Sequence, residues 1–231
     1  MPRFAPVRAG IGILFVAVAA ESTSGCAPIS AGVQSEFRRP GRVYLLRGLI
    51  NIYSLGMDSL AGKLRAENID ARVAPWMSYG GLARQLIRDY RSGNHEPICL
   101  IGHSQGVDHA LSVARSLQEE RIPVDLIVSL DEWLSHEIPS NVDRVVTIHK
   151  RHSFLHYQRM TSERGREVEW RDVDLRKNPY DETPGYVYHF YLDIDPRVHR
   201  IVIAEVLRVC RPAAQAAAIR VDAAPEAESL P

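Results

Sequence analysis

The chain has no excess of charge of either sign. Its 231 residues contain 28 Lys plus Arg and 28 Asp plus Glu, so the formal net charge is zero. Proteins that hold nucleic acid or an anionic membrane surface through a general field carry a clear basic excess. We therefore expect no nucleic-acid partner, and any ligand must be recognised by a local site.

Cysteine is also scarce. The three cysteines, Cys26, Cys99 and Cys210, are too few and too scattered to suggest a disulfide framework. No CxxC pair and no His/Cys cluster has the spacing of zinc ligands, so the sequence predicts no metal site.

A long apolar run is missing as well. The longest run, residues 9–20, has about 12 residues, whereas a membrane-spanning helix needs about 20. Arg3 and Arg8 precede this run and small residues follow it, which is the layout of a secretory signal. We expect residues 1–26 to direct export from a bacterial cytoplasm to the periplasm.

Cys26 leaves two outcomes open for this segment. Thr23, Ser24 and Gly25 before it resemble the small residues of a bacterial lipobox, although Thr23 stands where such boxes usually carry Leu. One outcome is lipid attachment at Cys26, which would hold the protein on a membrane through its N-terminal lipid only. The other is cleavage nearby, which would release a soluble protein.

The remaining chain divides into three parts by composition. Residues 27–41 are a polar linker, residues 42–211 carry the patterns of one domain, and residues 212–231 are mostly Ala, Pro and Glu. Because the last part has little to bury, we expect a disordered tail there.

Strand and helix patterns alternate within the domain. Apolar runs predict strands at residues 43–47, 71–74, 97–101, 124–130 and 144–149, with a weaker one at 168–175. Helical spacing of apolar residues predicts helices at 57–68, 82–92, 107–119 and 196–207. Strands that are apolar on both faces indicate a buried parallel sheet. We expect an α/β fold with a mostly parallel sheet of about six strands and helices on both faces.

A G-x-S-x-G sequence joins the third predicted strand to the third predicted helix. It consists of Gly102, His103, Ser104, Gln105 and Gly106. A nucleophile elbow occupies this place, with glycines that let strand and helix pass and a helix N-terminus that favours a developing oxyanion. The pattern predicts that Ser104 is a nucleophile, and the alternative is a glycine-bounded turn with an incidental serine.

With this elbow the chain resembles the α/β-hydrolase superfamily, in particular small bacterial lipase-like and thioesterase-like serine hydrolases. The resemblance covers residues 42–208 and is carried by residues 46–49, 102–106 and 189–193. It implies a catalytic triad in the chain order serine, acid, histidine, and a reaction that needs no cofactor.

The resemblance places the base at His189, which lies just before the last predicted helix. Asp131 is our candidate for the acid, because it follows the fourth predicted strand at the sheet edge where ligands gather. Asp172, Asp174 and Asp181 remain its rivals.

An oxyanion hole would need two backbone N–H donors. Gln105, directly after the nucleophile, is expected to supply one, and Leu49, in the loop after the first strand, the other. Gly48 and Ile50 are alternatives to Leu49.

These features predict a serine hydrolase that cleaves a small-molecule acyl ester or thioester through an acyl-enzyme. The sequence does not separate an oxygen ester from a thioester. The alternative is an exported protein that keeps the α/β-hydrolase fold and binds a ligand without catalysis.

Export yields a testable expectation. Protein purified from a bacterial host should begin near Ala27, or at Cys26 with an added acyl mass that is lost in Cys26→Ser. Intact mass measures both outcomes, and a full-length mass that retains Met1 or Pro2 would contradict processing.

Overall fold

The computed structural model describes residues 38–48, 54–75, 78–132, 137–150, 160–163, 167–175 and 188–212. The predicted signal with Cys26 and residues 213–231 lie outside the described residues, so the predicted export, linker and tail stay predictions.

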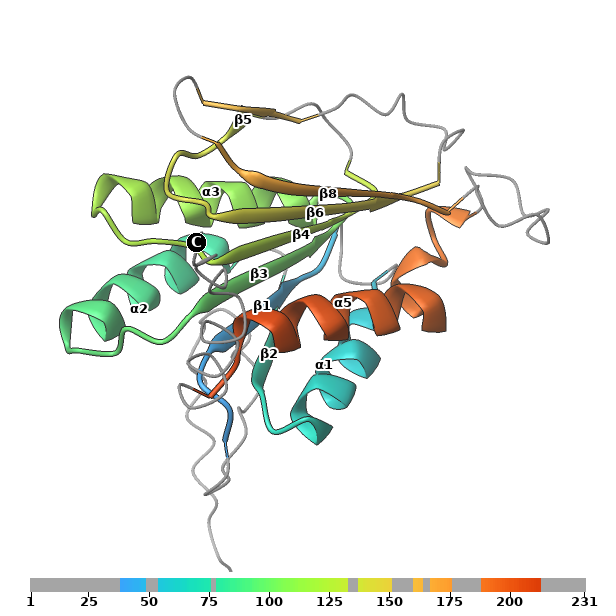
Figure 1. Ribbon diagram of the computed structural model, residues 1–231, viewed down its shortest axis with the longest axis horizontal. Coiled ribbons are helices and arrows are strands. Elements are labelled where there is room, and N and C mark those ends of the chain that lie inside the picture. The colour runs from blue at the N-terminus through green and yellow to red at the C-terminus, as the bar shows by residue number, and fades with distance from the viewer. Residues whose placement is uncertain are drawn as a thin grey trace, which may run out of the picture.

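Six parallel strands form the central sheet (Figure 1), in the order β2-β1-β3-β4-β6-β8. They are β1 (Arg42–Leu46), β2 (Asp70–Ala74), β3 (Ile98–His103), β4 (Leu126–Leu130), β6 (Arg144–His149) and β8 (Glu169–Asp174). Every neighbouring pair in this sheet is parallel. The expected α/β fold with a six-stranded, mostly parallel sheet is confirmed.

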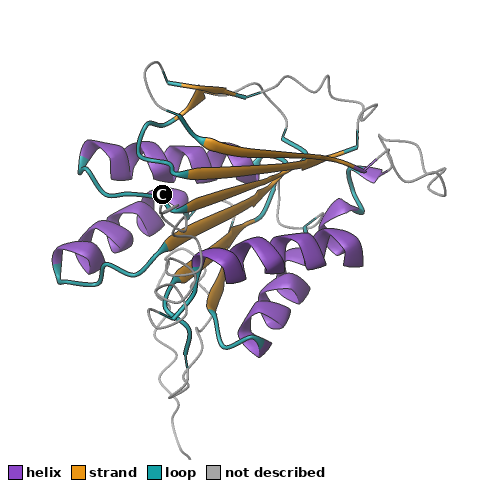
Figure 2. Cartoon of the chain, viewed as in Figure 1, coloured by secondary structure: helices purple, strands orange, loops and turns teal. Residues whose placement is uncertain are grey.

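Helices cover both faces of the sheet, as Figure 2 shows. They are α1 (Gly56–Ala66), α2 (Tyr79–Arg91), α3 (Gly106–Glu119) and α5 (Pro196–Val209). Alternate residues of β1 enter two separate cores: Val43 and Leu45 pack on the side of α1 and α5, and Tyr44 and Leu46 on the side of α2 and α3. This two-sided burial is why the strands are continuous apolar runs. None of the described helices is long and apolar enough to cross a bilayer.

Two short strands were not expected from the sequence. β5 (Glu137–Ile138) and β7 (Thr161–Ser162) pair with each other as a separate two-stranded sheet. Each has two residues, too few to show the alternation that identifies a strand.

The parallel connections bring the carboxyl ends of the strands to one edge of the sheet. β1 ends at Leu46 beside Gly102 of β3, β3 ends at His103 beside Leu130 of β4, and β4 in turn pairs with β6. Residues that follow these strands therefore share the edge where ligands bind in such folds.

Candidate active site

Ser104 occupies a sharp turn between β3 and α3. Its φ is +55°, a left-handed conformation that is unfavourable for a residue with a side chain. A Cβ on Gly102 would stand 2.5 Å from the nitrogen of Val107, and one on Gly106 would stand 2.1 Å from the oxygen of Leu46. Only glycine fits at these two positions, so the turn has the geometry expected of a nucleophile elbow.

Backbone hydrogen bonds fasten both Ser104 and Asp131 to the neighbouring strand. The Ser104 N–H donates to the Leu130 carbonyl at 2.9 Å, and the Asp131 N–H donates to the Ile148 carbonyl at 2.9 Å. Asp131 also has a left-handed backbone, with φ +50°, which Asp tolerates better than most residues. The ladder of the sheet thus continues one step past β3 and β4 and carries these two residues with it.

His189 joins the two side chains. Its Nδ1 lies 2.6 Å from Asp131 Oδ2, and its Nε2 lies 3.1 Å from Ser104 Oγ. All three residues are buried. A carboxylate on Nδ1 holds the proton there and leaves Nε2 to accept the serine proton. The structure brings together the three residues that the sequence selected and places His189 between Asp131 and Ser104.

The rival acids differ in their surroundings. Asp172, on β8, accepts hydrogen bonds from Thr147 Oγ1 at 2.7 Å and pairs with His149 Nε2 at 2.9 Å. Asp174 lies on the same edge strand, beside His149 in the register. Asp181 is outside the described residues. Among the described carboxylates, the one hydrogen-bonded to His189 is that of Asp131.

His103, the second residue of the elbow, links three parts of the site. Its Nε2 lies 3.0 Å from the His189 carbonyl oxygen and its Nδ1 lies 2.8 Å from Ser54 Oγ. A carbonyl can only accept, so Nε2 carries the proton and Nδ1 accepts from the Ser54 hydroxyl. Ser54 Oγ in turn accepts from the Gly48 N–H at 3.1 Å.

This series of hydrogen bonds requires a neutral His103, and the environment of the ring keeps it neutral. Burial, followed by the proximity of His189, lowers the pKa of His103 to about 4. The imidazole is therefore uncharged at neutral pH, with one donor and one acceptor. His103 had no predicted role from the sequence. A polar residue between a buried strand and the elbow serine must nevertheless find buried partners, so its position alone could have marked it as part of the site.

The same hydrogen bonds narrow the choice of backbone N–H groups that could hold the oxyanion. Gly48 lies against the elbow, since a Cβ there would stand 3.1 Å from Ser104 Cβ. Its N–H, however, is directed to Ser54, which leaves Leu49 and Ile50 as candidates from this loop. Both lie outside the described residues. Gln105 is placed at the N-cap of α3, and its role stays a prediction.

Glu132 is a second buried carboxyl beside the site. Its Oε2 accepts from the Ser129 hydroxyl, and its Oε1 has no partner among the described residues. Burial is the main cause that raises the pKa of Glu132 from 4.5 to about 7. Glu132 is thus largely protonated below neutral pH.

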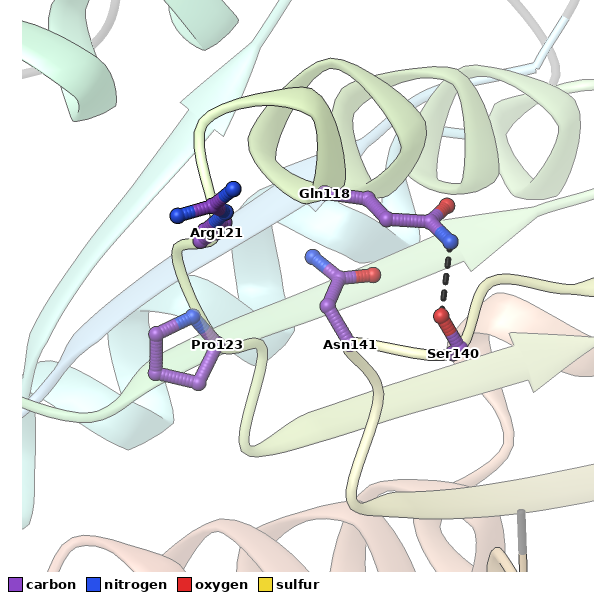
Figure 3. A pocket seen from close by; sticks show the side chains of 5 residues that line it. All are labelled: Gln118, Arg121, Pro123, Ser140 and Asn141. Atoms are coloured by element: carbon purple, nitrogen blue, oxygen red, sulfur yellow. Dashed lines mark hydrogen bonds between the residues drawn. The ribbon is translucent and has the colours of Figure 1, made fainter. Parts of the chain in front are cut away.

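The described residues contain no group of three or more His, Cys, Asp or Glu side chains arranged to hold a metal ion. A shallow pocket of about 280 Å³ lies at the end of α3, lined by Gln118, Arg121, Pro123, Ser140 and Asn141 (Figure 3). These residues precede β4 and β6, at the amino edge of the sheet and away from Ser104, Asp131 and His189. The Asn141 amide donates to the carbonyls of Ala114 and Ile122, so this side chain closes the α3–β4 turn.

The strand order, the helices on both faces of the sheet and the elbow together define an α/β-hydrolase fold. The chain matches no protein-family model and no curated protein sequence. Among solved structures it is similar to YbtT, a type II thioesterase from the yersiniabactin NRPS/PKS biosynthetic pathway. A mutant of YbtT matches at 10% identity and a TM-score of 0.43, over 80% of this chain and 98% of that one. A second YbtT structure matches at 12% identity and a TM-score of 0.40, over 76% and 94% of the two chains.

Removing the Ser54 hydroxyl tests the hydrogen bonds that run from Gly48 through Ser54 and His103 to His189. Ser54→Ala does not alter Ser104, His189 or Asp131 themselves, but it removes the partner of the Gly48 N–H and of His103 Nδ1. We expect a fluorophosphonate to label Ser104 roughly 10-fold more slowly, because a buried group left without its hydrogen bond costs about 1–3 kcal/mol.

Ser112→Ala is the matched control, since its hydroxyl donates to the Asp108 carbonyl at 2.8 Å within α3. Labelling should be unchanged in this variant. Equal labelling rates for Ser54→Ala and wild type would show that these hydrogen bonds do not position Ser104.

The raised pKa of Glu132 predicts that the stability of the fold depends on pH. Its carboxyl ionises near pH 4.5 in the unfolded chain but only near pH 7 in the folded one, so stability falls as pH rises between these values. Glu132→Gln removes this loss. Urea unfolding should show the variant more stable than wild type by up to about 3 kcal/mol at pH 8, with the difference fading towards pH 4.5.

Glu119→Gln, which alters an exposed carboxylate of α3, should leave stability unchanged at both pH values. A Glu132→Gln effect that is the same at pH 4.5 and pH 8 would mean that the carboxyl does not titrate in this range.

Proposed function

We propose that this protein is a serine hydrolase that cleaves a small-molecule acyl ester or thioester through an acyl-enzyme. The observation that carries the proposal is the hydrogen-bond chain from Asp131 through His189 to Ser104, at 2.6 Å and 3.1 Å. A serine hydroxyl is a weak nucleophile unless a base takes its proton, and the base needs a third group to hold its tautomer. Here His189 is positioned to take the Ser104 proton, and Asp131 is positioned to hold the His189 tautomer.

The geometry supports the following reaction. His189 Nε2 takes the Ser104 proton as Oγ attacks the acyl carbonyl, and Asp131 stabilises the imidazolium that forms. Backbone N–H groups at the start of α3 and in the loop after β1 hold the oxyanion. His189 then protonates the leaving alcohol or thiol. Water, activated by the same base, releases the acyl group from Ser104.

Apolar side chains beside the base suit an acyl substrate. Phe190 and Tyr191 are each 52% exposed, and the Phe190 ring meets the His189 ring edge-on, with centroids 5.3 Å apart. Oxygen esters and thioesters would use the same residues, and relative rates on a matched pair would distinguish them. The proposal includes action in the periplasm after export, which rests on the N-terminal sequence.

Two substitutions test the triad. Ser104→Ala should abolish fluorophosphonate labelling and lower hydrolysis of short nitrophenyl esters by at least about 10³-fold, because the nucleophile is lost. Asp131→Asn should lower turnover by up to about 10⁴-fold, since an amide would hold the wrong tautomer of His189. Circular dichroism should show both variants folded.

Asp172→Asn is the matched control for the acid, because this carboxylate pairs with a different histidine, His149. It should keep most of the activity. Loss in Asp172→Asn with retention in Asp131→Asn would overturn the assignment of the acid. Intact protein that fails to label while a control hydrolase labels would favour the non-catalytic binding protein instead.

A further inference from the structure

Two cysteines that are far apart in the chain lie side by side in the core. Cys99 is in β3, and Cys210 caps the C-terminus of α5. Both are free and fully buried, and their Sγ atoms are 3.9 Å apart. They belong to the core cluster shared by α1 and α5.

The surroundings of Cys210 are shaped around its sulfur. Gly41, just before β1, has φ +122°, and a Cβ at this position would stand 2.4 Å from Cys210 Sγ. Any larger residue at position 41 would displace this sulfur. Glycine thus leaves room for Cys210 Sγ next to Cys99.

We propose that Cys99 and Cys210 form a disulfide when the chain folds in an oxidising environment. An S–S bond is about 2.05 Å long, so the sulfurs must approach by roughly 1.9 Å from their separation here. Rotation of the two side chains and a small shift of the helix end supply this movement. Cys210 can shift because it caps α5 just past the last helical residue, Val209, where helix ends fray; its N–H donates to the Val206 carbonyl at 2.7 Å.

The bond forms by two exchange steps with a small disulfide such as oxidised glutathione. One cysteine thiolate attacks the small disulfide, forms a mixed disulfide and releases one glutathione thiolate. The second cysteine thiolate then attacks the mixed disulfide at the protein sulfur and releases the other glutathione. Two protein thiols lose two electrons and two protons, and the oxidant is reduced to two thiols.

Burial dictates when this exchange takes place. Neither sulfur is exposed, and the hydrogen bond with Cys210 together with burial raises the pKa of Cys99, so the native state offers little thiolate. The bond is therefore made during folding or when the end of α5 opens, and not by an oxidant that meets the closed protein. Once made, it is protected from reductants in the same way.

The bond would tie together the segments that carry the candidate site. It joins positions 111 residues apart, and Ser104, Asp131 and His189 all lie within the loop it closes. Closing a long loop restricts the unfolded chain most, so oxidation should stabilise the fold appreciably. This inference does not depend on whether Ser104 hydrolyses any substrate.

The test uses the full chain with Cys26→Ser, which removes the remaining cysteine. The protein is unfolded in denaturant that contains a reductant. It is then refolded either with a mixture of reduced and oxidised glutathione or with reductant alone. Alkylation in denaturant and mass spectrometry then count free thiols. We expect no alkylated cysteine after oxidative refolding, one linked peptide pair that contains Cys99 and Cys210, and a Tm at least about 5 °C above the reduced form.

Cys99→Ala and Cys210→Ala are controls in which the redox state during refolding should not alter Tm. The inference is overturned if both cysteines are still alkylated after oxidative refolding, or if the oxidised form melts no higher than the reduced one. A redox-dependent Tm of the same size in Cys99→Ala would also overturn it.

Discussion

The candidate site depends on the parallel pairing of β3, β4 and β6 continuing one step beyond the strands. The bonds from the Ser104 N–H to Leu130 and from the Asp131 N–H to Ile148 extend the ladder into two residues with left-handed φ. Such conformations cost on the order of 1–2 kcal/mol each, and the sheet compensates for this cost by holding both backbones. Ser104 and Asp131 are therefore parts of the sheet edge, and their separation follows from the spacing of neighbouring strands.

His189 is held differently, because it lies in a turn and not at the end of a strand. His103 holds its carbonyl and Asp131 holds its ring. Just beyond it, the Asp193 carboxylate accepts from the Gly56 N–H at 2.8 Å, which ties this segment to the start of α1. His189 is thus fixed by its contact to the elbow and, through the nearby Asp193, by a contact to the start of α1.

The elements that the sequence predicted well are those whose burial is dictated by residues close together in the chain. β6 has the predicted bounds, 144–149, and the other five strands of the central sheet lie within a few residues of theirs. The elbow was predictable because Gly102 and Gly106 bracket a serine between a strand and a helix, and Asp131 because parallel topology delivers it to the same edge. Their catalytic roles stay predictions.

The contacts that were not predictable join distant positions with no periodic signal. The approach of Cys210 to Cys99 depends on where α5 ends over the sheet, which no local pattern specifies. The pairing of β5 with β7 rests on two residues from each strand. The link from His103 to Ser54 needs the loop after β1 to turn back on the elbow, and only the folded chain shows that it does.

Two adjacent carboxyls at the end of β4 have opposite electrostatic roles, and the backbone separates them. The left-handed φ of Asp131 turns its carboxylate to His189, while Glu132, two residues past the end of β4, accepts from the hydroxyl of Ser129 in that strand. The Asp131 charge is one of the causes that raise the pKa of Glu132, so ionisation of Glu132 beside it is unfavourable. Below neutral pH, Glu132 is therefore largely neutral and adds little negative charge beside the pair of Asp131 and His189. The turn that aims one carboxylate at His189 is also what places the other where burial keeps it protonated.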